Sequence, residues 1–251
     1  MRDSAGSATD LHGYGQGLLG GNTFNNTASS GMGSLGTGGR ITSSADVAAL
    51  DALQSFTISG WMRNMSSLSG SGAVLFQDIQ SATANGISLT LGNNLMQITI
   101  NNSTHQSSVG AYSSALTDWV FFAVTFNGAG GANNLNFYVG STSAPVTLVN
   151  SVTTPQTVTT NNTQIAGIGN SIFGAQNNRP FDGMLDNFRV HGSQADSSGA
   201  LSLAELEGVR YLDTTILPEP STVMLLLMGA PLWRAIRRRM AASGSIVEDA
   251  S

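Results

Sequence analysis

Short runs of β-branched and aromatic residues recur along most of this 251-residue chain, and clusters of glycine, asparagine and serine separate them. Short strands divided by turn residues are typical of an antiparallel β-sandwich. A single sandwich can use a chain of this length, so the length does not require a second domain. The runs are residues 56–62, 73–78, 86–91, 95–100, 119–126, 135–140, 144–149, 163–169 and 184–192.

Two of these runs are joined by the sequence LGNNL, residues 91–95. Gly92, Asn93 and Asn94 tolerate the positive φ that a tight hairpin turn needs. Residues 86–91 and 95–100 are therefore predicted to pair as a hairpin.

The run WVFFAVTF, residues 119–126, has large apolar side chains on both faces of a strand. Alternation places one set on each face. A strand that is apolar on both faces is predicted to lie in the middle of a sheet. One set is Val120, Phe122, Val124 and Phe126, and the other is Trp119, Phe121, Ala123 and Thr125.

Only residues 201–212, LSLAELEGVRYL, have the pattern of a helix. Ser202 can cap the helix, and Glu205 follows three residues later, as in a capping box. Leu203, Leu206 and Val209 share one face of the predicted helix, which we expect to pack on the edge of the sandwich.

The N-terminal part of the chain is weakly patterned. Residues 6–39 are rich in glycine, which predicts loops with at most one irregular strand. The first fifteen residues contain Arg2 but no apolar stretch behind it, so they do not have the form of a secretory signal peptide. If the protein is exported, we expect the true start to lie upstream of Met1.

Charge and cysteine content exclude several classes of function. Charged residues make up 10% of the chain, the formal net charge is -5, and there is no lysine. Four of the ten arginines lie near the C-terminus, so the remaining chain is acidic and nucleic acid is not an expected partner. The absence of cysteine excludes disulfides, thiol catalysis and cysteine zinc sites.

Several segments resemble the laminin-G-like, or concanavalin A-like, jelly-roll domains, in that family's order. They are FTISGWMR (56–63), DWVFFAVTF (118–126), FDGMLDNFRV (181–190) and LSLAELEGV (201–209). The resemblance implies an all-β fold, an antiparallel jelly-roll sandwich, over residues 1–212. The family usually opens with an apolar strand before the glycine-rich segment. That strand is not found here, which again points to a start upstream of Met1.

Asp186 is the candidate metal ligand. In MLDNFRV, residues 184–190, the alternation that points Phe188 and Val190 inward also points Asp186 inward, and a buried carboxylate needs a partner. The resemblance implies a structural Ca²⁺ here, held by Asp186 and by backbone oxygens from near the N-terminus. The alternative is an aspartate that accepts backbone N–H bonds in a turn or at a bulge.

The distribution of catalytic residue types does not favour an enzyme. Relatives of this fold that hydrolyse glycosides use closely spaced carboxylates, but Glu205 is the first glutamate and the preceding aspartates form no close D-x-D pair. His12, His105 and His191 are far apart in the chain and belong to no metal or triad motif.

The C-terminal segment differs from the rest of the chain. Pro218, Glu219 and Pro220 lead into an apolar run, residues 221–233, which ends at a cluster of arginines. In this order the three features resemble the PEP-CTERM sorting signal of Gram-negative bacteria, although such signals normally end close to the arginines. The arginines are Arg234, Arg237, Arg238 and Arg239.

This resemblance implies a linker (213–220), a hydrophobic sorting or transmembrane helix (221–240) and a disordered tail (241–251). An exosortase-type protease would process the Pro-Glu-Pro motif while the helix is transiently anchored in the inner membrane. The arginines would keep the C-terminal end cytoplasmic. A helix over residues 221–236 would be about 24 Å long, shorter than a hydrocarbon core of about 30 Å. Arg234 must then snorkel or the bilayer must thin. The alternative is a helix docked on the domain or lying in the membrane interface.

These observations together predict an exported, non-catalytic binding or adhesion module of the outer envelope or extracellular matrix. Its expected ligand is a polysaccharide or another surface polymer, such as a surface protein. Two alternatives are a glycoside hydrolase of this fold and a purely structural matrix protein without a ligand.

Overall fold

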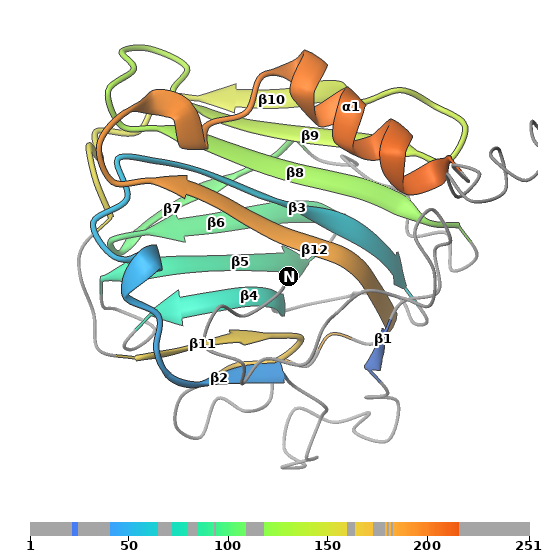
Figure 1. Ribbon diagram of the computed structural model, residues 1–251, viewed down its shortest axis with the longest axis horizontal. Helices are drawn as coiled ribbons and strands as arrows, with labels where there is room; N and C mark the ends of the chain where they lie inside the picture. The colour runs from blue at the N-terminus through green and yellow to red at the C-terminus, as the bar shows by residue number, and fades with distance from the viewer. Residues whose placement is uncertain are drawn as a thin grey trace, which may run out of the picture. The chain divides into compact units, whose positions relative to one another are not determined.

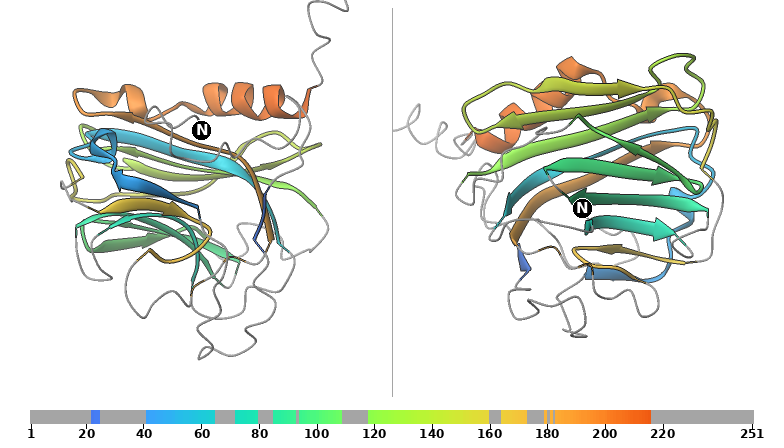
Figure 2. Two further views of the ribbon diagram at one scale, coloured as in Figure 1. Left: turned by 60° about the horizontal axis from the view of Figure 1, so that its bottom comes forward. Right: turned by 180° about the vertical axis from the view of Figure 1, so that it is seen from behind.

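The computed structural model describes residues 22–24, 41–64, 72–79, 85–92, 94–108, 118–159, 164–172, 179, 181 and 183–215. These residues form two six-stranded sheets that pack face to face, with one helix outside the sandwich (Figure 1, Figure 2). Every strand pairing is antiparallel. The predicted all-β, antiparallel jelly-roll sandwich is confirmed.

The first sheet has the strand order β1-β12-β3-β8-β9-β10. The last strand of the chain therefore lies between the first and the third. The strands are β1 (Asn22–Phe24), β3 (Ser55–Asn64), β8 (Val120–Asn127), β9 (Leu135–Ser141), β10 (Thr147–Val152) and β12 (Gly183–Ser193).

The second sheet has the order β2-β11-β4-β5-β6-β7. Its strands are β2 (Ile41–Asp46), β4 (Ala73–Ile79), β5 (Gly86–Gly92), β6 (Leu95–Ile100), β7 (Ser103–Gln106) and β11 (Ile165–Ile168). The edge strands β2 and β7 were not predicted, because both are polar and lack the apolar alternation of the other runs. The described residues also form two 3-10 turns, η1 (Ala48–Leu50) and η3 (Ser197–Gly199), and the helix α1 (Leu203–Thr214).

The predicted hairpin is confirmed. Strands β5 and β6 pair from Ile87 with Ile100 to Gly92 with Leu95. Asn94, in the connecting turn, has a φ of 61°, which lies in the left-handed region that asparagine tolerates.

The prediction that residues 119–126 form a central strand is also confirmed. Strand β8 lies between β3 and β9. Phe122 and Phe126 point into the core between the sheets, whereas Phe121 and Ala123 belong to a second apolar cluster on the outer face of the first sheet. Both faces of this strand are therefore covered.

Strand β10 begins later than predicted, at Thr147 instead of residue 144. The N–H of Ser141 donates to the carbonyl oxygen of Ala144 at 3.0 Å, so residues 142–146 form the turn between β9 and β10. The apolar run therefore begins in the turn, before the strand starts.

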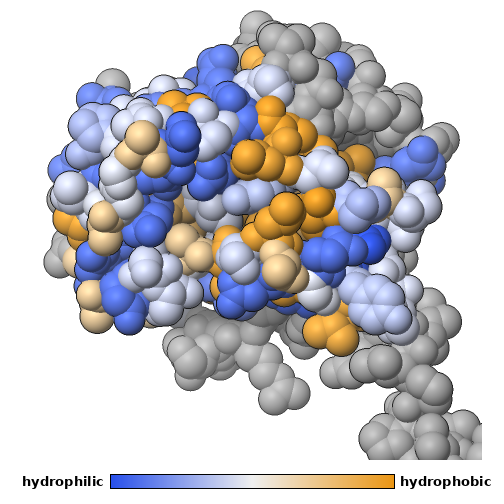
Figure 3. Space-filling view, turned by 90° about the horizontal axis from the view of Figure 1, so that it is seen from above, coloured by the Kyte–Doolittle hydropathy of each residue, from blue (hydrophilic) through white to orange (hydrophobic). Residues whose placement is uncertain are grey.

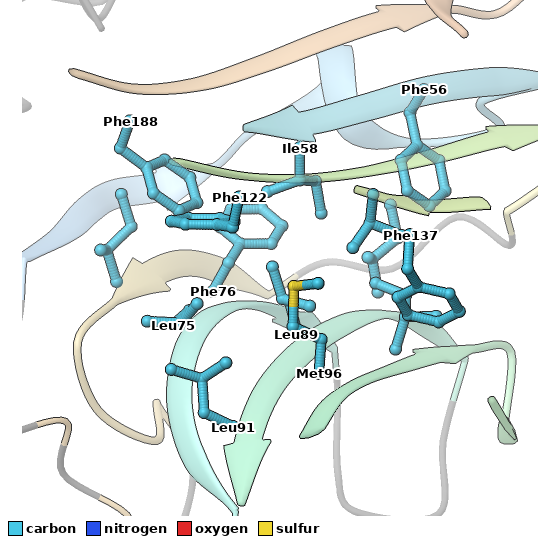
Figure 4. Packing of buried hydrophobic residues seen from close by; sticks show 14 of the residues in the cluster. Phe56, Ile58, Leu75, Phe76, Leu89, Leu91, Met96, Phe122, Phe137 and Phe188 are labelled. Atoms are coloured by element: carbon cyan, nitrogen blue, oxygen red, sulfur yellow. The ribbon is translucent and has the colours of Figure 1, made fainter. Parts of the chain in front are cut away.

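The main core lies between the two sheets, where fully buried side chains from both interdigitate (Figure 4). The rings of Phe76 and Phe188, one from each sheet, stack with centroids 5.8 Å apart. Complete burial of a side chain of this size stabilises the fold by about 1.5–3 kcal/mol. The first sheet contributes Phe56, Ile58, Phe122, Phe137 and Phe188, and the second contributes Leu75, Phe76, Leu89, Leu91 and Met96.

The helix α1 forms as predicted but packs in a different place. Its capping box is present, because Ser202 accepts from the N–H of Glu205 and the Glu205 carboxylate accepts from the N–H of Ser202. The helix covers the outer face of the first sheet instead of an edge (Figure 2). Leu206 is fully buried there, but Leu203 is exposed, so the predicted inward face was wrong at Leu203.

Candidate ligand-binding face and the predicted site residues

The outer face of the second sheet is lined by hydroxyl and amide side chains. In β6, Met96, Ile98 and Ile100 are buried in the core, so the alternating Gln97 and Thr99 point outward. Cross-strand partners extend this pattern over four strands. We call this set the Thr/Gln ladder: Gln77, Ser88, Thr90, Gln97, Thr99, Thr104 and Gln106.

Hydrogen bonds between neighbouring strands hold the ladder in place. The hydroxyls of Thr99 and Thr104 lie 2.9 Å apart, and Gln77 Nε2 donates to Ser88 Oγ at 3.3 Å. Each of these groups can both donate and accept, so an exposed group keeps capacity for a ligand.

The ladder is open at one end and covered at the other. Thr104 and Gln106 are exposed, and Gln97 and Thr99 are half-buried, whereas Gln77 is buried. The N–H of Ile172 donates to Gln77 Oε1 at 3.1 Å, so the chain after β11 lies over this end. A ligand can therefore reach the ladder on β6 and β7.

The open strands β6 and β7 and the neighbouring β5 carry no ionised side chain. Strands β5, β6 and β7 contain no aspartate, glutamate, arginine, phenylalanine, tyrosine or tryptophan. His105 pairs with Ile98 and so faces the inner side, where its ring nitrogen lies 3.1 Å from Ser103 Oγ. Burial lowers the pKa of His105, which keeps the ring neutral near pH 7. The surface can recognise hydroxyl groups but offers no charge.

In the described part of the chain, exposed charges are acidic. The carboxylate-bearing residues Asp46, Asp118, Asp196 and Glu205 are exposed, whereas the described arginines are buried or half-buried. Hydrogen bonds from Ser193 and Ser198 hold the pKa of Asp196 at about 2, so this residue stays charged in any ordinary buffer.

Asp186, the predicted metal ligand, lies on the opposite face of its strand from the one predicted. Asp186 pairs directly with Trp61, whose side chain belongs to the cluster under α1. Leu185 and Phe188 both face the core. The prediction that Asp186 points into the core with Phe188 and Val190 is therefore wrong.

A β-bulge causes this difference. The register of β12 against β3 shifts between Asp186 and Arg189, and Asn187 within the bulge has a φ of 47°. An extra residue in one strand interrupts the alternation of side chains. Gly60 lies opposite, where a Cβ would come 3.2 Å from the Cα of Phe188, so a larger residue there would crowd the bulge.

The surroundings of Asp186 match the alternative suggested from the sequence. Its Oδ1 accepts a hydrogen bond of 2.7 Å from the N–H of Asn187, and the side chain is fully buried. Within the described ranges, no three His, Cys, Asp or Glu side chains are grouped so that they could hold a metal ion. These residues do not make up a calcium cage, and most of the N-terminal segment implied to complete one lies outside them. The calcium site stays a prediction.

A polar cluster beside α1 was not predicted. Asp213 Oδ2 accepts from Trp61 Nε1 at 2.9 Å and from the Arg189 guanidinium at 2.8 Å, and a second Arg189 nitrogen bonds Oδ1. Asp213 is buried, so these donors compensate its desolvation. The sequence signal was weak, because Arg189 and Asp213 are 24 residues apart and no motif connects them.

Aromatic side chains that would otherwise suit sugar stacking are buried between α1 and the outer face of the first sheet. Trp61 and Phe121 meet edge to face with centroids 5.4 Å apart, and both are fully buried under α1. They act as core residues and are not accessible to a ligand in this structure.

The predicted sorting residues, Pro218, Glu219 and Pro220 with the arginine cluster, lie outside the described residues. They belong to a second unit of the chain, Ile216–Ser251. Over the described ranges, which end at Thr215, no helix has the length and apolar character required to cross a membrane.

Comparison with known families gives a match to a family model described as the concanavalin A-like lectin/glucanases superfamily. The match spans residues 35–198, about two thirds of the chain, and includes all strands from β2 to β12. The chain belongs to this superfamily. The resemblance inferred from the strand segments is therefore confirmed for the jelly-roll domain.

Two solved structures of bacterial domains share this fold. Domain 4 of an extracellular arabinanase from Geobacillus stearothermophilus, in complex with arabinotriose, matches at 16% identity and a TM-score of 0.52. That match covers 81% of this chain and 86% of the other. The CBM40 domain of the Ruminococcus gnavus IT-sialidase matches at 12% identity and a TM-score of 0.50, covering 81% and 96%. At these identities the likeness shows the fold. No curated protein sequence gives a significant match.

Proposed function

We propose that this domain is a non-catalytic module that binds an uncharged polysaccharide through the Thr/Gln ladder. The observation that carries the proposal is the exposed array of hydroxyl and amide groups on β6 and β7, which has no charged or aromatic side chain. Sugar hydroxyls both donate and accept, as do these groups. A domain of the same fold has been solved in complex with arabinotriose, which is consistent with a neutral sugar ligand.

The charge distribution supports an uncharged ligand over an acidic one. An anionic glycan needs arginine or lysine at its site, because a desolvated carboxylate or sulfate requires a cationic or strongly donating partner. The chain has no lysine, and Arg189 and Arg210 are already paired with Asp213 and Glu207. The exposed charges of the described surface would repel an anionic polymer.

The binding proposal is tested by affinity electrophoresis in gels that contain uncharged or anionic polysaccharides. Gln97→Ala and Thr104→Ala should each weaken binding of a neutral polysaccharide by about threefold to tenfold, the effect of losing one hydrogen bond. Thr147→Ala, exposed on the first sheet, is the matched control and should bind like the parent.

Three results would contradict this proposal. Parent-like binding by both ladder variants would place the site elsewhere. Retardation by anionic polysaccharides alone would show that charge governs recognition. New reducing ends in the retained polysaccharide would show that the domain is an enzyme.

We propose further that this module is exported and that its C-terminal segment sorts it to the cell envelope. The apolar run 221–233 can enter a bilayer, and the arginines behind it favour the cytoplasmic side. Residues 218 and 220 are prolines, which keep the preceding backbone extended and therefore accessible to a processing protease of the exosortase type.

The sorting proposal is tested by replacing residues 218–220 with alanines in a protein carrying a signal peptide, in a host with an exosortase. Membrane insertion should persist and shortening of the protein should stop. Neutral residues at 237–239 should instead weaken membrane retention or invert the orientation. Immunoblots of membrane and secreted fractions distinguish these results. If the triple-alanine protein is shortened and released like the parent, the segment is an anchor or a docked helix and not a sorting signal.

A further inference from the structure

Uncharged residues make up most of the surface that the helix α1 presents to solvent, and Glu205 is an exposed ionised residue on it. Leu203, Tyr211 and Leu212 are 45%, 57% and 56% exposed, and Ala204 and Gly208 between them are also exposed. We call these five residues the α1 outer surface. An amphipathic helix of a soluble domain normally carries charged or polar residues there.

This apolar surface continues onto the sheet beside α1. Leu148 of β10 pairs with Tyr138, which belongs to the cluster under α1, so Leu148 lies on the same outer face. It is 50% exposed. The face seen in Figure 3 shows apolar side chains gathered among hydrophilic ones. A patch of this kind indicates a contact with another apolar surface.

Two of the three carboxylates of α1 are paired with an arginine, and Glu205 stays ionised and exposed. Glu207 pairs with Arg210, and Asp213 pairs with Arg189. The carboxylate of Glu205 is held by the backbone N–H and the hydroxyl of Ser202. Glu205 is therefore the one carboxylate of the described helix that approaches a lipid surface without an arginine partner, and the pairing of Glu207 and Asp213 lowers the cost of that approach.

The position of α1 in the chain indicates that a membrane covers the α1 outer surface. The helix ends at Thr214, and the apolar run begins at residue 221. Six extended residues reach at most about 20 Å. If the apolar run enters a bilayer, the last turn of α1, with Tyr211 and Leu212, is held within that distance of the head groups. Tyrosine is enriched at membrane interfaces because its ring is amphipathic.

We propose that the α1 outer surface rests on the head-group region of the membrane. This inference depends on the membrane insertion of residues 221–233 proposed above. The Thr/Gln ladder lies on the outer face of the other sheet, across the sandwich from α1 (Figure 2). The domain then sits on the bilayer by one face and directs its sugar-binding face toward the extracellular polymer.

The experiment uses the full-length chain, which has no cysteine, so one introduced cysteine carries one label. Gly208→Cys and Leu212→Cys place an environment-sensitive fluorophore on the α1 outer surface. A Cβ at position 208 meets nothing within 4 Å, so the substitution is tolerated there. Thr104→Cys on the Thr/Gln ladder is the matched control, and Leu226→Cys reports on the apolar run. Each protein is mixed with phosphatidylcholine vesicles, with or without a nitroxide quencher in the head-group region.

A blue shift and loss of fluorescence to the quencher are expected at positions 208, 212 and 226, and neither is expected at 104. Insertion at 226 without quenching at 208 and 212 would overturn the inference but leave the membrane anchor intact. No signal at any of these positions would overturn both. Equal quenching at 104 would show that the domain has no fixed orientation. The fluorescence could also change as the protein concentration rises in the absence of vesicles. That result would show that a second copy of the chain covers the α1 outer surface, and it would overturn the inference.

Discussion

Asp213 connects α1 to two strands of the first sheet through side-chain hydrogen bonds. Its carboxylate accepts from Trp61 Nε1 and from two nitrogens of Arg189. Because Asp213 is buried, the loss of its carboxylate leaves the indole N–H of Trp61 without this acceptor. It also leaves the half-buried Arg189 guanidinium without its counter-ion, with the carbonyl oxygen of Asn187 still bonded to it.

Asp213→Ala is expected to destabilise the domain by about 3 kcal/mol, the cost of removing one partner of a buried ion pair. Urea unfolding followed by tryptophan fluorescence measures the change. Asp46→Asn, at an exposed position on the edge strand β2, is the control and should change the free energy of unfolding by less than about 0.5 kcal/mol. Equal losses for the two variants would contradict the role given to Asp213.

Glu207 gives the domain a defined pH dependence. Its hydrogen bond with Arg210 is the main cause that lowers the pKa of Glu207 from 4.5 to about 2. The folded-state pKa lies below the unfolded-state value, so the stabilisation is fully present above about pH 4.5 and is lost as the pH falls toward 2.

Glu207→Gln should therefore flatten the decrease of Tm between pH 5 and pH 2, as measured by thermal unfolding at a series of pH values. Asp196 and Glu205 also have lowered pKa values and titrate in the same acidic range, so part of the slope should remain. An unchanged slope in the variant would show that the Glu207–Arg210 pair does not affect the folding equilibrium.

At the scale of elements, a glycine in a strand and a glycine in the helix differ in whether the backbone requires glycine. Gly86, at the start of β5, has a φ of 127°, and a Cβ there would lie 2.1 Å from the carbonyl oxygen of Asp78. Gly208 lies within α1, where a Cβ meets nothing within 4 Å. The first position requires glycine and the second does not.

Gly86→Ala should therefore cost at least about 3 kcal/mol, because it combines backbone strain with a severe clash. Gly208→Ala should stabilise the domain by about 0.5–1 kcal/mol, since alanine favours helix. Chemical denaturation of both variants gives the two free energies. If the two substitutions change the free energy of unfolding in the same direction, the different requirements for glycine at positions 86 and 208 are contradicted.

At the scale of the whole molecule, α1 completes the sandwich. Its residues Leu206 and Val209 cover Trp61, Phe121 and Tyr138 on the outer face of the first sheet. The compact unit that contains the described residues ends at Thr215, immediately after the helix. The sandwich and α1 should therefore fold together without the C-terminal segment.

A protein that ends at Thr215 should keep the fluorescence spectrum of a buried tryptophan and unfold cooperatively. A protein that ends at Ser202 lacks α1 and should expose Trp61, shift the fluorescence to the red and bind a hydrophobic dye. Urea titration and dye binding compare the two. If removing α1 leaves both observables unchanged, the helix is an appendage and not part of the core.

Local patterns in the sequence determined much of this fold. The spacing of apolar runs identified most strands, LGNNL specified the hairpin of β5 and β6, and Ser202 with Glu205 specified the start of α1. These features depend on residues close in the chain, so side-chain periodicity and backbone φ preferences are sufficient to predict them. The same hairpin already implied that Thr90 and Gln97 are neighbours. The Thr/Gln ladder was missed because its residues are neither charged nor aromatic.

Only the tertiary structure decided which faces are covered. The bulge at Asn187 reversed the side on which Asp186 lies, because Gly60, far away in sequence, leaves room for it on the neighbouring strand. The placement of α1 on a face depended on Asp213 reaching Trp61 and Arg189, which the sheet topology brings together. Alternation and helical periodicity describe one element at a time. The side that each element buries is set by the free energy of packing against elements that lie far apart in the chain.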